Sequence, residues 1–140
     1  MAIVSFTAHK INFTLKQKKK LADWIQKVVL ANRHYPVEIA YIFCDDEFLF
    51  TLNREYLNHK TLTDIITFNY NSGFHISGDI FISVERVREN AIKYKIPFED
   101  ELHRVMVHGV LHLIGFNDKS ETEKKKMVKK ENESLSFLLL

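Results

Sequence analysis

Apolar residues recur along this chain with two alternating periods. Short apolar runs of about four to eight residues predict β-strands, and apolar residues three or four positions apart predict helices. The predicted strands span residues 3–6, 37–44, 65–70 and 78–83. The predicted helices span residues 16–33 and 99–114, and three more begin after the capping residues Asp45 and Asp46, Ser83, and Ser120. The strands at 65–70 and 78–83 are expected to form a hairpin through Asn71-Ser72-Gly73. Runs of strands and helices with a hairpin in the middle predict an α+β fold, in which helices pack on a small mixed β-sheet.

The length and composition are ordinary for one globular domain. The chain has 140 residues, of which 46% are hydrophobic and 27% charged, so we expect a single domain over residues 1–140. Cys44 lies in an apolar run and is expected to be a small buried side chain. We expect a cytoplasmic protein, because no signal-peptide layout is present and no apolar run approaches the roughly 20 residues of a membrane helix.

The charge of the chain permits nucleic acid as a partner without indicating it. The net charge is +2, and lysines cluster within residues 16–20 and 124–130. Glutamates at 121, 123 and 131 accompany the second cluster. Solvated helix faces explain such clusters more readily than RNA-binding patches do, and both interpretations remain open.

The predicted helix over residues 99–114 is apolar except for one stripe. At about 100° per residue, Glu101, Arg104, Val105 and His112 fall within about 60° of His108. The opposite side is apolar and consists of Leu102, Met106, Val107, Val110, Leu113 and Ile114. Polar groups on a mostly buried helix need partners or ions, so the stripe marks a candidate site.

Three residues at the end of this helix have the spacing of metal ligands. His108 and His112 are four positions apart and share one face of the helix, although such a pair alone is more typical of surface or core histidines. Gly115 can adopt the left-handed conformation that ends a helix, after which Asp118 can turn back toward both histidines. Two imidazoles and a carboxylate predict a Zn²⁺ site whose fourth position is open to water, the pattern of catalytic zinc.

Several segments of the chain resemble one known family. HGVLHLIGFND (residues 108–118) resembles the HGxLHLxGYDH signature of the YbeY family of metal-dependent endoribonucleases, which act in ribosomal RNA maturation and quality control. LNREYLNHKTLTDIITF (52–68) resembles the family's LNxxYRxxDxPTDVLSF, and GDIFIS (78–83) resembles its GDIVIS strand. The resemblance implies a zincin-like fold, one Zn²⁺ per chain, RNA of the small ribosomal subunit as the substrate, and ribosome-associated proteins as partners.

Three positions depart from the pattern of the family it resembles. Asp118 stands where the family usually has a third histidine, and Asn117 stands where it usually has Asp. Asp is a competent zinc ligand, but its harder, charged oxygen changes the metal preference. Leu57 replaces an Arg that the family uses toward RNA, and Leu cannot contact a phosphate. These departures weaken the expectation of full ribonuclease activity, whereas the prediction of a metal site is unchanged.

The general base is not identified by the sequence. Gly109 stands where HExxH proteases carry the catalytic Glu, which argues against a peptidase. Glu101 is a candidate group behind the metal ligands or a partner of the helix dipole, and Arg104 is a candidate for binding phosphate or for pairing with a carboxylate. Asp64 and Asp79 match acidic positions of the family segments, and each is equally a candidate site residue or a turn former.

The other histidines do not have ligand spacing. His59 and His75 lie in predicted loops, where we expect no catalytic role. His103 faces the apolar side of its helix, where a hydrogen-bonded core histidine is expected.

Three functions are compatible with these residues and with what the family resemblance implies. The leading hypothesis is a zinc-dependent endoribonuclease specific for single-stranded RNA, which predicts metal-dependent cleavage that is lost in His112→Ala. One alternative is a metal-containing ribosome assembly factor with weak or no catalysis, which would bind ribosomal particles without turnover. The other is a metallopeptidase-like hydrolase, which would cleave peptides and not RNA.

Overall fold

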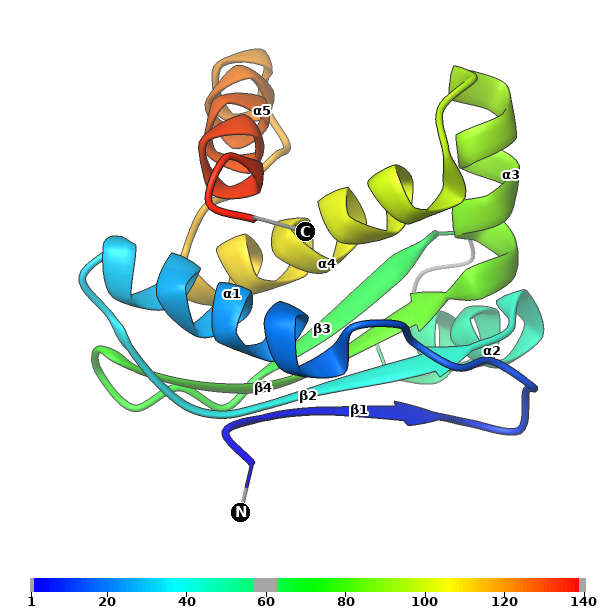
Figure 1. Cartoon of the computed structure of the whole chain (residues 1–140), viewed down its shortest axis with the longest axis horizontal. Coiled ribbons are helices and arrows are strands. Elements are labelled where there is room, and N and C mark those ends of the chain that lie inside the picture. Colours follow the sequence, from blue (N-terminus) through cyan, green and yellow to red (C-terminus); the bar gives the residue numbers. More distant parts are fainter. Residues whose placement is uncertain (1, 57–62, 139–140) are drawn as a thin grey trace.

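The computed structural model describes residues 2–56 and 63–138. Within these ranges, four strands form one mixed sheet in the order β1-β2-β4-β3 (Figure 1). The strands are β1 (Val4–Ala8), β2 (Tyr35–Cys44), β3 (Ile65–Asn69) and β4 (His75–Ser83). The pairs β1–β2 and β2–β4 are parallel, whereas β3 and β4 form an antiparallel hairpin. The predicted α+β architecture with a mixed sheet is therefore confirmed.

Five helices accompany the sheet in the same described ranges: α1 (Lys18–Ala31), α2 (Asp46–Tyr56), α3 (Val84–Tyr94), α4 (Phe98–Ile114) and α5 (Glu121–Leu135). Side chains alternate between the faces of a strand, and this alternation divides the core in two. On one face, Ile80 and Ile82 of β4 join the large core formed with α1 and α4, and on the other Phe81 packs with Leu49 of α2. Helices α1 and α4 thus cover one face of the sheet, and α2 covers part of the other (Figure 1).

Helix α4 is the most buried of these helices, and it carries the predicted ligands. Its apolar side packs on β3 and β4, and the Tyr41 hydroxyl of β2 donates a 2.8 Å hydrogen bond to the Met106 carbonyl. Helix α5 packs against α4, and the Trp24 indole of α1 donates to the Ser134 carbonyl at the end of α5. Phe137 and Leu138 pack on the core, whereas residues 139–140 lie outside the described ranges. Helix α4 therefore packs against the sheet on one side and against α5 on another.

The local capping signals of the sequence are present in the structure. The Ser83 hydroxyl accepts a hydrogen bond from the Arg86 N–H at the start of α3. At the start of α5, Ser120 and Glu123 form a reciprocal capping box.

Among the helices of the described part of the chain, none combines the length and apolar character that a membrane-spanning segment requires.

Two close contacts fix the end of α4 on the hairpin. Leu113 lies directly against Gly78 of β4, where a β-carbon would be only 2.9 Å from both Leu113 methyl carbons. The Asn71 side-chain amide, in the turn of the hairpin, donates a 2.7 Å hydrogen bond to the Leu113 carbonyl. The last turn of α4, which carries His112, is therefore anchored to the sheet.

A candidate metal centre at the end of helix α4

Helix α4 brings His108 and His112 side by side, one turn apart. Their Nε2 atoms lie 2.9 Å from one another, and the rings meet nearly edge to face. Both side chains are about three-quarters shielded from solvent, with 21% and 25% of their surface exposed. The predicted pairing of the two histidines on one helical face is therefore present in the structure.

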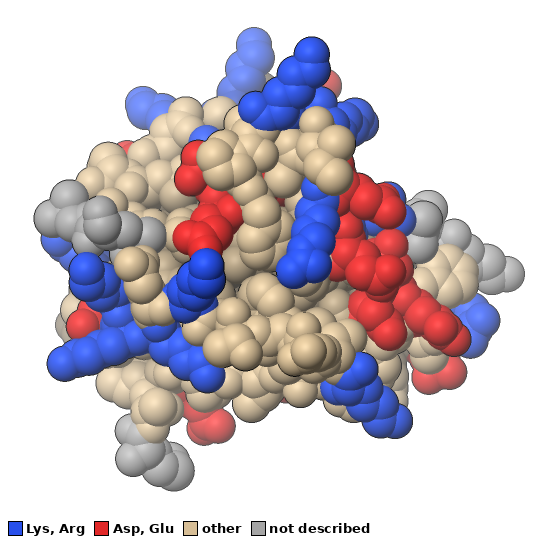
Figure 2. Space-filling model, turned by 45° about the vertical axis from the view of Figure 1, so that its right-hand side comes forward, with Lys and Arg blue, Asp and Glu red and all other residues tan. Residues whose placement is uncertain are grey.

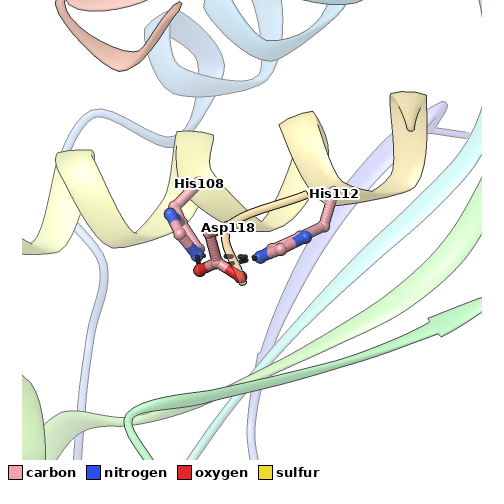
Figure 3. A group of neighbouring side chains, drawn as sticks. All are labelled: His108, His112 and Asp118. Carbon is pink, nitrogen blue, oxygen red and sulfur yellow. Dashed lines mark hydrogen bonds and ion pairs between the residues drawn. The ribbon is translucent and has the colours of Figure 1, made fainter. Parts of the chain in front are cut away.

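The chain then turns back and adds Asp118 to the pair. Gly115 caps the C-terminus of α4, with a φ of 123°, a conformation that L side chains rarely adopt. Its N–H still donates to the Leu111 and His112 carbonyls. After this turn, Asp118 Oδ2 lies 3.2 Å from His108 Nε2 and 3.5 Å from His112 Nε2. Figure 3 shows the carboxylate pointing between the two imidazoles.

The three donor atoms fit a single tetrahedral metal ion. Ligands about 2.0–2.1 Å from a zinc ion at tetrahedral angles lie about 3.3–3.4 Å from one another, and the separations here are 2.9, 3.2 and 3.5 Å. Within the described residues, this trio is the group of His, Cys, Asp and Glu side chains whose spacing suits a metal ion. Nitrogen and oxygen donors suit Zn²⁺ and related transition metals.

A buried glutamate of α5 completes the surroundings of His108. Glu131 Oε2 lies 2.6 Å from His108 Nδ1, and Glu131 Oε1 accepts a 2.8 Å hydrogen bond from Arg104 Nη1. Glu131 is only 6% exposed. The sequence pattern indicates Glu131 only as one of the acidic residues that accompany the lysine cluster at 124–130. Its spacing from Met127 and Ser134, which are also buried, is the signal that places it on the inner face of α5.

The environment shifts the pKa values of the two histidines in opposite directions. Burial lowers the pKa of His108, but the hydrogen bond and charge of Glu131, together with the charges of Asp118 and Asp64, outweigh it and raise the pKa overall. The pKa of His112 is lowered, because burial and the neighbouring His108 both disfavour its protonated form. Metal ligation requires a free imidazole nitrogen, so a proton competes with a metal ion mainly at His108.

A cavity of about 250 Å³ opens beside His108 and Asp118, and Asp64 and Glu101 help to line it. Glu101 is 5% exposed, and its pKa is raised by burial and by the charge of Asp64, against the opposing effect of Arg104. Burial also raises the pKa of Asp64, although His108 opposes the shift. Raised carboxyl pKa values in a cavity next to ligand-type residues are typical of groups that transfer protons.

The structure distinguishes between the two roles considered for Arg104. Its guanidinium pairs with Glu131 at 2.8 Å and donates a second hydrogen bond to the Asn132 side-chain oxygen at 2.9 Å. Arg104 therefore pairs with a carboxylate and links α4 to α5 beside the candidate metal ligands.

Gly109 leaves no room for the base of a protease. A β-carbon at this position would lie 2.8 Å from side-chain carbons of both Ile65 and Ile80. Position 109 therefore packs against the sheet, and a glutamate there would enter the core.

The remaining predicted candidates lie elsewhere or outside the described residues. Asp79 accepts a hydrogen bond from the exposed Tyr70 hydroxyl and does not line the cavity. His75 begins β4 on the surface, which corrects its prediction as a loop residue, because β4 starts there in register with Tyr35. His103 is buried edge-on against the Trp24 ring. Leu57 and His59 lie outside the described residues.

The charged surface is mixed. On the side of the molecule that carries α3, Figure 2 shows a dense group of acidic side chains beside separate Lys and Arg side chains.

Close to the candidate metal centre, two lysines of α5 lie over the ring of Phe116, two residues before Asp118. Lys126 Nζ is 5.5 Å and Lys130 Nζ 5.4 Å from the ring centroid. Positive charge is thus present beside the segment that connects Gly115 to Asp118.

Comparison with known proteins gives a consistent answer. Residues 4–138 match the family model described as Endoribonuclease YbeY. Proteins named Endoribonuclease YbeY from Flavobacterium psychrophilum and Phocaeicola vulgatus are 49% and 43% identical to the chain. The alignments cover 96% of both chains in the first case, and 99% of this chain and 100% of the relative in the second.

A solved structure has the same fold. The solution structure of TM1509 from Thermotoga maritima superposes with a TM-score of 0.67 at 23% identity, over 96% of this chain and 88% of that one. The zincin-like α+β fold expected from the resemblance is therefore confirmed. With a family match over nearly its whole length and relatives above 40% identity, this chain belongs to the YbeY family of endoribonucleases.

Proposed function

We propose that this protein is a zinc-dependent endoribonuclease that cleaves single-stranded RNA in small-subunit ribosomal RNA maturation and ribosome quality control. The observation that carries the proposal is the convergence of His108, His112 and Asp118 on one point at the end of a buried helix. The names of the family and of its relatives support RNA as the substrate. The proposed partners are the small ribosomal subunit and ribosome-associated proteins, and the proposed location is the cytoplasm.

His108 Nε2, His112 Nε2 and Asp118 Oδ2 would hold one zinc ion per chain. When bound, zinc supplies a water whose pKa falls to about 7 and a positive charge beside the scissile phosphate. Three protein ligands leave a tetrahedral ion one further position, as in catalytic zinc sites. The carboxylate ligand reduces the net positive charge of the site relative to three neutral imidazoles.

Two carboxyl groups are placed to accept the proton of the attacking water. Asp64 and Glu101 line the same cavity as His108 and Asp118, and burial raises the pKa of each. A proton acceptor works best when its pKa approaches the working pH. We assign this role to the Asp64–Glu101 pair, and Arg104 to the support of Glu131.

Two lysines beside the segment that leads to Asp118 would contact the RNA backbone. Lys126 and Lys130 lie over Phe116 in the loop that leads to Asp118. Ammonium groups at this point favour approach of a polyanion, and such contacts weaken as salt concentration rises. RNA therefore fits the surroundings of the ligands better than a neutral peptide substrate does.

The test is metal content and RNA cleavage measured on the same purified samples. We compare wild type with His112→Ala and Asp118→Ala, and use His75→Ala as the matched control because His75 lies on the surface of β4, away from the cavity. We expect about one zinc per chain and RNA cleavage in the wild type and the control. Both variants at the ligands should lose zinc and cleavage together.

Two other outcomes would redirect the proposal. Zinc retained in the wild type without RNA cleavage would indicate an assembly factor, and cleavage of peptides alone would indicate a peptidase. A wild-type protein reconstituted with zinc that fails to hold it would refute the metal centre.

A further inference from the structure

Glu131 is a buried acidic side chain whose position the proposed reaction alone does not require. It comes from α5, whereas both histidines come from α4. Removing a carboxylate from water is costly unless its oxygens are paired. Here each oxygen has a separate partner, Arg104 for Oε1 and His108 for Oε2.

The contact with His108 determines which ring nitrogen is available. Glu131 Oε2 is an acceptor 2.6 Å from Nδ1, so the proton of the neutral ring belongs on Nδ1. The lone pair is then on Nε2, the nitrogen that faces Asp118 and His112. A carboxylate behind a ligating histidine also fixes the plane of the ring and raises its basicity.

The carboxylate is itself held in place. Arg104 donates to Glu131 and to Asn132, both on α5, and the side chain of Glu131 is 8% exposed. The arrangement therefore links α5, through Glu131, to the ring that faces the candidate metal position. An ion pair that only joined α4 to α5 would need Arg104 and Glu131, and would not need the additional contact of Glu131 with His108.

We propose that Glu131 is the positioning residue of this metal centre, which holds His108 in the Nε2-ligating form and couples metal binding to the docking of α5. The proposal rests on the proposed function, because it presumes that His108 ligates a metal. Metal bound by the chain should then be held more weakly when the Glu131 carboxylate is replaced by a neutral amide, even with the fold intact.

The experiment measures the dissociation constant for zinc by competition with a chromophoric chelator. Glu131→Gln keeps the size of the side chain and removes its charge. Glu133→Gln is the matched control, since Glu133 lies on the same helix, is 47% exposed, and its carboxylate pairs with Lys130 at 3.5 Å on the surface. We expect Glu131→Gln to weaken zinc binding by about 10–100-fold. Glu133→Gln should remain within about 2-fold of the wild type, because surface pairs contribute little.

A second measurement keeps the proposal testable if Glu131→Gln disturbs the fold. Long-range nitrogen–proton NMR of the imidazole rings in the wild type reports which nitrogen of His108 carries the proton, and we expect Nδ1. Equal zinc affinity of Glu131→Gln and wild type in folded protein would overturn the proposal. So would a neutral His108 ring that carries its proton on Nε2 instead of Nδ1 in the metal-free wild type, measured at a pH where the ring is neutral. Failure of the wild type itself to bind zinc would instead refute the proposed function beneath it.

Discussion

Substituting Gly78→Ala should loosen the sheet from the helix that carries the ligands. Gly78 is the β4 residue paired with Asn69, and Leu113 of α4 packs directly on it. An added β-carbon would lie 2.6 Å from the Phe68 carbonyl oxygen and 2.9 Å from both Leu113 methyl carbons. Non-bonded carbon atoms prefer about 3.5–4.0 Å, so either the hairpin or the end of α4 must shift.

The magnitude follows from two opposing effects. The methyl carbons of Leu113 can rotate, but the Phe68 carbonyl belongs to the β3–β4 ladder and cannot move without disturbing it. Overpacking of this kind costs about 1–3 kcal/mol. Replacing a glycine within a strand returns about 0.5–1 kcal/mol, because the unfolded chain loses freedom. We therefore expect a net loss of about 1–2 kcal/mol and a fall in melting temperature of about 3–8 °C.

Urea unfolding followed by circular dichroism measures this loss, with zinc affinity measured alongside. The control is Gly73→Asn in the hairpin turn, where φ is +58° and no atom lies within 4 Å of an added β-carbon. Asn tolerates this conformation better than other side chains do, so the control should change stability by less than about 0.5 kcal/mol. A Gly78→Ala protein as stable as the wild type would refute the close packing of α4 on β4.

Three further predictions concern other parts of the fold. Cys44 is fully buried, and burial together with the charges of Asp45 and Asp46 raises the pKa of its thiol from 9.0 to about 12. Alkylation of the folded protein at pH 8 should therefore be at least about 1,000-fold slower than that of the urea-unfolded chain, and equal rates would contradict the burial of Cys44. Burial lowers the pKa of His103, against the opposing charges of Glu99 and Asp100. Below a pH of about 6.5 the unfolded chain therefore takes up a proton that the folded protein resists, and the folded protein loses stability. Urea titrations should show that His103→Leu loses less stability than the wild type between pH 7 and 5. Ser120→Ala removes the capping box of α5 and should cost about 1 kcal/mol, which an unchanged urea midpoint would disprove.

The sequence predicted the parts of the site that depend on local spacing. His108, His112 and Asp118 lie close together because a helical repeat and one glycine turn suffice to place them. Glu131 was missed as a partner because its contact with His108 depends on how α5 packs across α4, which no local pattern specifies. The alternatives for Arg104 stayed open for the same reason, since its partner is on α5.

The ends of the strands show the same division between local and long-range causes. The apolar run of β2 predicts a start at residue 37, yet the strand begins at Tyr35 because that residue pairs with His75 of β4. Neither residue is in an apolar run, so only the parallel pairing reveals that both belong to the sheet. Strand cores could be predicted from hydrophobicity, but their full lengths depend on partners distant in the chain.

The close spacing of the ligands has a consequence for the unfolded chain. His108 and Asp118 are only ten positions apart, so a short flexible segment can gather all three donors before any sheet has formed. Metal affinity of the denatured ensemble reduces the stabilisation that metal confers on the native state. Glu131, thirteen positions beyond Asp118 and on a separate helix, joins His108 only once α4 and α5 are docked. Under the proposed function, a newly synthesised chain would therefore bind the metal ion weakly before it folds, and more tightly once α5 has docked against α4.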